Sequence, residues 1–235
     1  MLQQTQVSRV LPAYSAFLAR FPTLAALARA SLGDVLRVWS GLGYNRRARD
    51  LHRIARLHPH ALPRTVAELD ALPGVGAYTA GAVACFAHGT RTAFADTNIR
   101  RVLGRVFLGR TATEREAVDL DDRAAPRRAA SAWHHALMDL GATVCVARHP
   151  LCERCPLRTV CAYDGTETPR RRKQAAFGPS DRRIRGAIVR ALASRRSSTI
   201  ASLRREIDDR RVPALVAALA DEGLVELTSR GVRLP

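Results

Sequence analysis

The sequence lacks long apolar stretches and is poor in aromatic residues. No run of about 18 apolar residues occurs, which argues against a membrane-spanning helix. The start, from Met1 to Gln4, has neither a basic nor an apolar segment, so it does not have the features of a signal peptide. Aromatic residues make up only 5% of the chain, β-branched runs are short, and alanine and leucine are frequent. This composition favours helix, and the apolar fraction of 47% is large enough for a core.

Acidic residues are too few to balance the basic ones. The 235 residues include 38 Lys and Arg against 21 Asp and Glu, for a formal net charge of +17. A GC-rich genome would explain the preference for arginine but not the imbalance of sign. A protein this basic usually binds a polyanion, and the arginine fork suits phosphate, so the charge predicts nucleic acid binding.

Cysteine is also scarce, which argues against a disulfide scaffold and favours a cytoplasmic location. Four of the five cysteines nevertheless cluster as Cys145, Cys152, Cys155 and Cys161, at spacings of six, two and five residues. Thiolates in one short loop favour zinc or an iron–sulfur cluster. Zinc sites usually use two close pairs, and only Cys152 and Cys155 form one, so the spacing favours the cluster over zinc or free thiols. Cys85 lies in an apolar helical segment and is expected in the core.

The pattern along the chain predicts an all-α protein with a small C-terminal α+β domain. Apolar residues recur at helical spacing from residue 2 to about 103 and again from 132 to 144, whereas residues 112–130 are charged and favour a solvated helix and loop. The run Arg170–Lys173 is typical of a linker, and the three helices and two short strands after it resemble a winged helix. We therefore expect domains at 1–162 and 181–235, joined by a basic linker at 163–180.

A tight turn from Leu72 to Gly76 separates two expected helices. Gly74, Val75 and Gly76 let the backbone approach a phosphate closely, and the N–H groups of the next helix point at that position. Such a turn anchors DNA without reading its sequence. A plain helix–helix turn is the alternative when the motif is taken alone.

Longer motifs place these features in one family. The order of hairpin, Asp96 and cysteine loop resembles the helix-hairpin-helix DNA glycosylases. Within these, the runs MLQQTQV at 1–7, WSGLGY at 39–44, ARDLH at 48–52 and MDLGA at 138–142 resemble the adenine DNA glycosylase (MutY) family, from Met1 to about Cys161. The resemblance implies a helix-hairpin-helix glycosylase fold with a [4Fe–4S] cluster in the loop at 145–161. It also implies a monomeric bacterial cytoplasmic enzyme that acts on double-stranded DNA with a mispaired or oxidised base.

The resemblance implies that Asp96 stabilises the positive charge that develops on the sugar as adenine leaves. Tyr78 and Asn98 would orient Asp96 and the sugar. Relatives that also cut the strand carry a lysine at the place of Tyr78, and a phenol cannot form the required Schiff base, so we expect a monofunctional enzyme. The structural alternatives are a helix N-cap for Asp96 and helix packing for Tyr78.

Further residues are implied to contact DNA. Gln4 and Tyr44 would enter the base stack beside the oxidised guanine, and Arg148 in the cysteine loop would meet a phosphate. Each has a structural alternative: a solvated helix position for Gln4, a core aromatic for Tyr44 and a plain basic loop for Arg148. The cysteines at 145, 152, 155 and 161 would bind the cluster.

The sequence departs from the family in two places. The family's general-acid glutamate lies two residues before the position of Met1, which indicates a misplaced start or a truncation and predicts impaired adenine excision. The C-terminal segment is shorter than the family domain that checks the opposite guanine. An endonuclease III-like glycosylase/lyase and a non-catalytic iron–sulfur DNA-binding protein remain alternatives.

Overall fold

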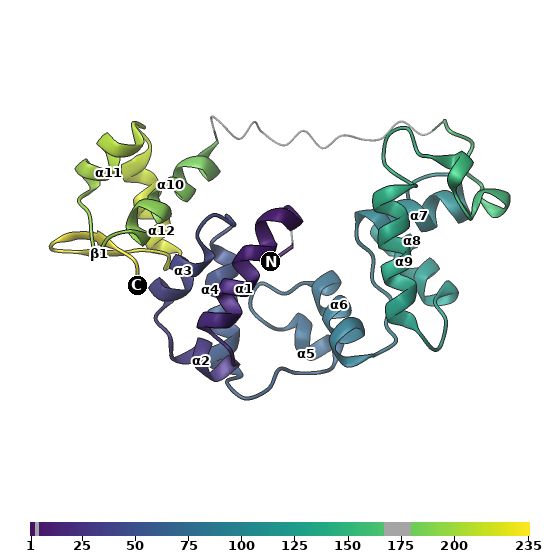
Figure 1. The fold of residues 1–235 in the computed structure, drawn as a ribbon, viewed down its shortest axis with the longest axis horizontal. Helices are drawn as coiled ribbons and strands as arrows, with labels where there is room; N and C mark the ends of the chain where they lie inside the picture. Colours follow the sequence, from purple (N-terminus) through teal and green to yellow (C-terminus); the bar gives the residue numbers. More distant parts are fainter. Residues whose placement is uncertain (3–4, 167–179) are drawn as a thin grey trace. The chain divides into compact units, whose positions relative to one another are not determined.

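The computed structural model describes residues 1–2, 5–166 and 180–235, so Gln4 and the basic run at 170–173 lie outside the described residues. The chain forms two compact units, one of Met1–Leu62 with Lys173–Pro235 and the other of Pro63–Arg172 (Figure 1). The C-terminal helices share a core with the N-terminal ones. The expected domain boundaries after residues 162 and 180 stay a prediction.

The first unit is made from both ends of the chain. Its elements are α1 Val7–Arg20, α2 Leu24–Arg29, α3 Leu32–Trp39, α4 Arg46–Leu57, α10 Asp181–Ala193, α11 Ile200–Ile207, α12 Val212–Asp221, β1 Glu226–Thr228 and β2 Gly231–Arg233. The two strands pair antiparallel, with Leu227 opposite Val232. Three helices followed by a hairpin confirm the small C-terminal α+β fold that the sequence predicts. We call residues 181–235 the C-terminal module.

The C-terminal module packs on helix α3. Ile184, Ile188 and Leu192 of α10 are fully buried in the same core as Leu36 and Trp39 of α3. Burial of side chains this large stabilises a fold by roughly 1.5–3 kcal/mol each. The end of the chain closes this contact, because the backbone N–H of Gly33 donates to the carbonyl of Pro235 at 2.6 Å. A Cβ at residue 33 would meet that oxygen at 2.5 Å, so the position requires glycine.

Helix α1 contains an internal proline and exposes part of its apolar pattern. It runs through Pro12 without interruption, because a proline in the second turn removes only one hydrogen bond from the ladder. Val10 and Phe17 are buried, whereas Leu11 and Tyr14 of the same apolar pattern are more than half exposed.

The second unit contains the hairpin, Asp96 and the cysteines. Its elements are α5 Val66–Asp70, α6 Ala77–His88, α7 Thr97–Leu108, α8 Glu114–Ala124, α9 Ala130–Thr143 and two short 3₁₀ turns, Cys152–Arg154 and Arg158–Val160. Helix α7 packs against α8 and α9, and α5 packs against α6. Ile99, Val102 and Leu103 carry α7 into the core of this unit, where Cys85 is also buried as expected.

The segment 112–130 is more ordered than its charge predicts. Thr113 and Glu116 form a capping box at the start of α8, and Asp121 on its inner face is fully buried. Asp121 accepts hydrogen bonds from Trp133 Nε1 at 2.7 Å and from the backbone N–H of Phe94 at 3.2 Å, and pairs with His134 Nε2 at 2.7 Å. These hydrogen bonds replace those that the Asp121 carboxylate loses with water. The high charge of segment 112–130 therefore did not predict that Asp121 is buried.

Candidate functional site

The hairpin has the backbone geometry that close approach to an anion requires. Gly74 adopts φ +71°, and the N–H of Val75 donates to the carbonyl of Leu72 at 3.1 Å. Gly76 is the N-cap of α6, and no side chain caps that end of the helix within the described structure. A Cβ placed on Gly76 would meet no atom within 4 Å. The start of α6 therefore leaves room for an external acceptor at the N–H groups of Ala77 and Tyr78.

Asp96 is the N-cap of α7, and the cap fixes its carboxylate. Oδ1 accepts from the backbone N–H groups of Asn98 at 2.8 Å and Ile99 at 2.7 Å. Oδ2 accepts one longer hydrogen bond, from the Asn98 amide at 3.2 Å. The structural alternative for Asp96 is thus correct, and it does not compete with a chemical role. A carboxylate held at one oxygen by two amides presents the other oxygen in a defined direction.

Tyr78, on the first turn of α6, lies close to Asp96. Burial raises the pKa of its hydroxyl, and the negative charge of Asp96 raises that pKa further. The Tyr78 ring also packs edge-on against Phe94, with ring centroids 5.7 Å apart. The phenol therefore stays protonated near neutral pH and can donate a hydrogen bond. The structure thus brings Asp96, Asn98 and Tyr78 together beside the hairpin.

Arg101 extends this arrangement toward the cysteines. Its Nη2 donates to Asn98 Oδ1 at 2.7 Å and to the carbonyl of Gly141 at 2.6 Å, and its Nε donates to the carbonyl of Cys145 at 2.6 Å. Asn98 in turn donates to Asp96. A continuous chain of hydrogen bonds therefore joins the Asp96 carboxylate to the backbone of the first cysteine in the loop.

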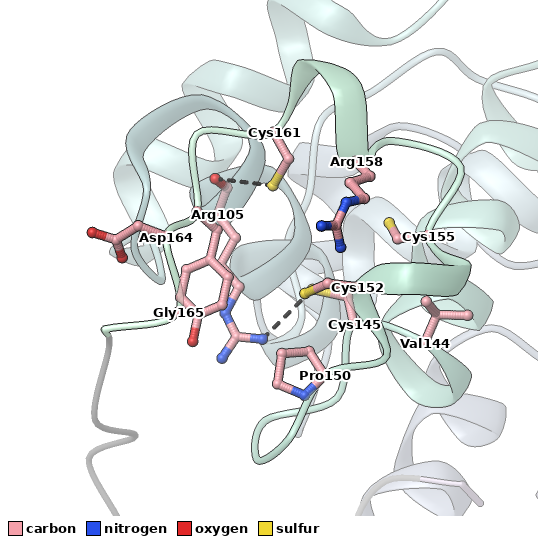
Figure 2. Close-up of a pocket in the computed structure, with 11 residues that line it drawn as sticks. Arg105, Val144, Cys145, Pro150, Cys152, Cys155, Arg158, Cys161, Asp164 and Gly165 are labelled. Carbon is pink, nitrogen blue, oxygen red and sulfur yellow. Dashed lines mark hydrogen bonds between the residues drawn. The ribbon is translucent and has the colours of Figure 1, made fainter.

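The four clustered cysteines line one cavity of about 370 Å³ (Figure 2). All four are free thiols and are partly exposed. The cavity is also lined by Arg105, Arg158 and Tyr163. The sequence spacing therefore identified side chains that the fold gathers around one space.

Arg105 is the buried cation of this cavity, with 1% of its surface exposed. Its Nη1 lies 3.6 Å from Cys145 Sγ (Figure 2). The same nitrogen donates to the carbonyl of Val146 at 2.9 Å. Its guanidinium lies 4.4 Å from the centre of the Tyr163 ring. A buried guanidinium needs a nearby negative charge, and deprotonated thiolates would provide it.

The donor set fits an iron–sulfur cluster. Among the residues that the structure describes, no three His, Cys, Asp or Glu side chains converge closely enough to hold a single metal ion. A four-iron cluster is bound at its corners, so its cysteines stand farther apart than the ligands of one ion. Four thiols line one cavity here, and Arg105 and Arg158, which line it too, would balance the charge of an anionic cluster.

Arg148, expected to meet a phosphate, lies exposed in the loop between the first two cysteines. His149 beside it adopts φ +51°, so the backbone turns sharply there. The position suits contact with a phosphate but does not distinguish it from a solvated basic loop.

Tyr44 belongs to the first unit, and 41% of its surface is exposed, so it is not the core aromatic that was the alternative. Arg47 joins the N-terminal segment to the loop that contains Tyr44. Its Nη1 donates to the carbonyl of Met1 at 3.1 Å and its Nη2 to Thr5 Oγ1 at 3.1 Å, and its guanidinium lies 5.2 Å from the centre of the Tyr44 ring. Met1 and Thr5 thus lie near Tyr44, although about 40 positions separate them from it in the sequence. Gln4 lies outside the described residues.

Sequence reasoning did not find Arg101, Arg105 or Arg47. One signal for Arg105 was present: it lies within the apolar pattern of α7, between Leu103 and Val106, where a charge is unusual. Arg47 and Arg101 lie in segments rich in arginine, and nothing in the sequence separates them from solvated neighbours.

Comparisons with known proteins agree with this geometry. Residues 1–121 match the model of the HhH-GPD superfamily base excision DNA repair proteins. The chain is 42% identical to the adenine DNA glycosylase of Mycolicibacterium smegmatis over 98% of this chain and 83% of that protein. It is 41% identical to the human adenine DNA glycosylase over 68% of this chain and 31% of that protein.

Solved structures show the same fold. A thermostable thymine-DNA glycosylase superposes with a TM-score of 0.60 at 28% identity, covering 69% of this chain and 79% of that one. A trapped endonuclease III–DNA covalent intermediate superposes with a TM-score of 0.60 at 26% identity, over 68% of this chain and 78% of that one. The chain therefore belongs to the HhH-GPD superfamily of base excision DNA repair proteins, and within it to the adenine DNA glycosylase (MutY) family of DNA glycosylases.

Proposed function

We propose that this DNA glycosylase removes adenine paired with 8-oxoguanine or guanine in double-stranded DNA, and that it leaves an abasic site. The observation that carries the proposal is the fixed Asp96 carboxylate beside Tyr78 on the helix that follows the hairpin. The relatives named as adenine DNA glycosylases support the choice of base.

Asp96 supplies electrostatic stabilisation in this proposal. Breaking the N-glycosidic bond builds positive charge on C1′ and O4′ of the sugar, and a fixed carboxylate beside them lowers the energy of that state. The two amides at Oδ1 orient the group before substrate arrives, so little reorganisation is needed during the reaction. Asn98 and Tyr78 orient the carboxylate relative to the sugar.

Tyr78 sets the outcome after the base has left. Its hydroxyl is held protonated by burial and by Asp96, and a phenol cannot attack the sugar to form an imine. We therefore expect hydrolysis by water and no strand cleavage. The endonuclease III neighbour was trapped as a covalent intermediate with DNA, and we expect this chain to differ from it in that step.

We propose that Cys145, Cys152, Cys155 and Cys161 bind a [4Fe–4S] cluster. When bound, the cluster would cross-link the loop from residue 145 to residue 161 and fix its basic side chains for contact with phosphates. Arg105 would balance the negative charge of the cluster from the buried side. We also propose that the chain acts as a monomer in the cytoplasm, in contact with duplex DNA.

Excision of adenine also needs a general acid that protonates the base as it leaves. Such acid help is typically worth about 10²–10⁴-fold in rate, and it affects the parent chain and its variants alike. The informative comparison is between this polypeptide and its own variants, rather than with another enzyme.

The test is single-turnover excision of adenine opposite 8-oxoguanine, followed over long incubation. Asp96→Asn keeps a side-chain oxygen that can cap α7, so the fold should persist while excision falls to the uncatalysed background. The parent chain should release adenine above background, leave the strand intact and give no covalent adduct with borohydride. Excision by the variant at the parent rate, or trapping of the parent, would overturn the proposal.

A further inference from the structure

Arginine side chains contact the loop that contains Tyr44, and the Tyr44 ring is exposed among them. We call residues 41–44 the GLGY loop. Tyr44 adopts φ +49°, which is costly for a residue other than glycine and persists only when neighbours hold it. Arg9 of α1 donates to the carbonyl of Gly41, and Arg47 of α4 lies against the Tyr44 ring. An exposed aromatic ring among arginines is the combination that DNA-contacting surfaces use for stacking and charge.

A third arginine reaches this loop from the far end of the sequence. Arg182, on the first turn of α10, donates from Nη1 to the Tyr44 hydroxyl at 3.1 Å. The two residues are 138 positions apart, yet both belong to the first unit. The C-terminal module therefore contributes a side chain to the same surface as the GLGY loop.

The position of Arg182 is fixed because its helix is fixed. Two residues beyond it, Ile184 is fully buried in the core shared with α3. Glu222, which follows α12, pairs with Arg46 of α4 at 2.6 Å and with Arg185 of α10 at 2.5 Å. The carbonyl of Glu222 also accepts from Arg49 at 2.6 Å. The module is thus joined to α4 beside the GLGY loop and cannot drift from it without breaking these contacts.

The usual reading helix of a winged-helix domain is a poor candidate for DNA contact here. The third helix of the module, α12, exposes Pro213, Ala214, Ala217 and Asp221, and none of these offers a donor to a phosphate or a base edge. The basic residue of the module that contacts the GLGY loop, Arg182, is instead on its first helix.

We propose that the C-terminal module is part of the DNA-binding surface of this chain, through Arg182. Its guanidinium donates to an oxygen of the DNA strand that passes Tyr44. A guanidinium carries five N–H donors, so a bond to Tyr44 and a bond to DNA are compatible. The oxygen belongs either to a phosphate or to the base that stacks on Tyr44. The proposal rests on the proposed function, in which that strand carries the base opposite adenine.

The test is duplex binding by fluorescence anisotropy over a range of salt concentrations. Two duplexes carry 8-oxoguanine or guanine opposite a 2′-fluorinated adenosine, which resists excision, so binding is measured apart from catalysis. Arg182→Ala is compared with Arg190→Ala, an exposed arginine at the other end of α10. Far-UV circular dichroism and thermal melts check the fold, and Arg182→Gln is a milder second variant.

We expect Arg182→Ala to weaken binding about tenfold relative to Arg190→Ala, because a charge-assisted contact is lost. An equal loss on both duplexes, with the salt slope smaller by about 0.9, identifies a phosphate. A loss confined to the 8-oxoguanine duplex identifies the oxidised base. Binding equal to that of Arg190→Ala on both duplexes would overturn the proposal. A parent chain that binds but shows no preference for 8-oxoguanine would instead count against the proposed function.

Discussion

At the scale of single residues, Asp96 shows how a structural role prepares a chemical one. The two backbone N–H groups that it caps hold Oδ1 at 2.8 and 2.7 Å, so the orientation of the carboxylate is set by helix α7 itself. The N-cap was the structural alternative to catalysis in the sequence-based interpretation. In the structure, the same N-cap hydrogen bonds orient the Asp96 carboxylate. The position of Asp96 in the sequence could be predicted. The support that its partner Asn98 receives from Arg101, which also donates to the carbonyls of Gly141 and Cys145, could not.

Arg101 is the residue whose replacement should separate positioning from chemistry. Arg101→Ala removes hydrogen bonds to Asn98, to Gly141 and to Cys145, so Asp96 loses the support of Asn98 and the cysteine loop loosens. Outer partners of a metal site typically change affinity or activity by about 10–100-fold. We expect a comparable fall in the single-turnover excision rate together with a lower iron content per chain.

Two further variants make this result specific. Arg127→Ala, an exposed residue of the same unit, should leave both the rate and the iron content unchanged. Arg101→Lys keeps the charge but not the planar fork, so it should rescue little. An Arg101→Ala protein with full iron content and the parent excision rate would show that these hydrogen bonds contribute neither to excision nor to iron binding.

At the scale of elements, the start of α6 offers a test in which stability and binding separate. Gly76 has φ −122°, which any residue can adopt, and a Cβ there would meet no protein atom within 4 Å. Gly76→Ala should therefore fold normally. Its methyl group would stand where a phosphate approaches the first N–H groups of the helix, so we expect weaker binding of damaged and undamaged duplexes alike.

Gly186→Ala in α10 is the matched control, because its Cβ also meets nothing within 4 Å. It should raise stability by up to about 1 kcal/mol, since alanine is the better helix former, and leave DNA affinity unchanged. Equal affinities for the Gly76 variant and the parent would exclude the hairpin as a phosphate anchor.

The cysteine loop is the second element with a clear test. Cys152→Ser replaces a soft thiolate by a poor ligand, so anaerobically purified protein should lose most of its iron and its visible absorbance. Cys85→Ala is the control, because Cys85 is buried in the core outside the loop. Iron retained in the first variant, or zinc found in place of iron in the parent chain, would contradict the proposed cluster.

At the scale of the whole molecule, Glu222 links the C-terminal module to α4. The hydrogen bond from Arg46 is the largest cause that lowers the pKa of Glu222, from its ordinary value of 4.5 to about 2, and Arg185 adds to it. A carboxyl whose folded pKa is depressed stabilises the fold above its unfolded pKa. That stabilisation should be present at neutral pH and be lost as the pH falls from about 4.5 toward 2.

Glu222→Gln should therefore destabilise the first unit by about 1–3 kcal/mol at neutral pH, and the difference should shrink in acid. Denaturant unfolding would be followed by the fluorescence of Trp39 in a Trp133→Phe background, since the chain has two tryptophans. Glu226→Gln is the control, because its pair with Arg233 is largely exposed and should contribute less than about 1 kcal/mol. A Glu222 effect that is constant from neutral pH to pH 3 would show that its charge is not the cause.

The sequence by itself determined the local elements and the chemical candidates. The turn at Gly74 and the cysteine spacing depend on interactions between near neighbours in the chain, so pattern was sufficient to predict them. The buried Asp121 with His134, and the chain from Arg101 to Cys145, depend on helices that meet only after folding. No local pattern distinguishes these side chains from the many solvated charges around them.

Only the tertiary structure decided which ends of the chain belong together. Composition predicted a separate C-terminal domain after a basic linker, whereas burial of Ile184 and Ile188 joins that segment to α3 and places Arg182 at Tyr44. The physical reason is that apolar periodicity marks which face of a helix is buried but not which partner covers it. That partner is fixed by the complementarity of whole surfaces, which distant residues form together.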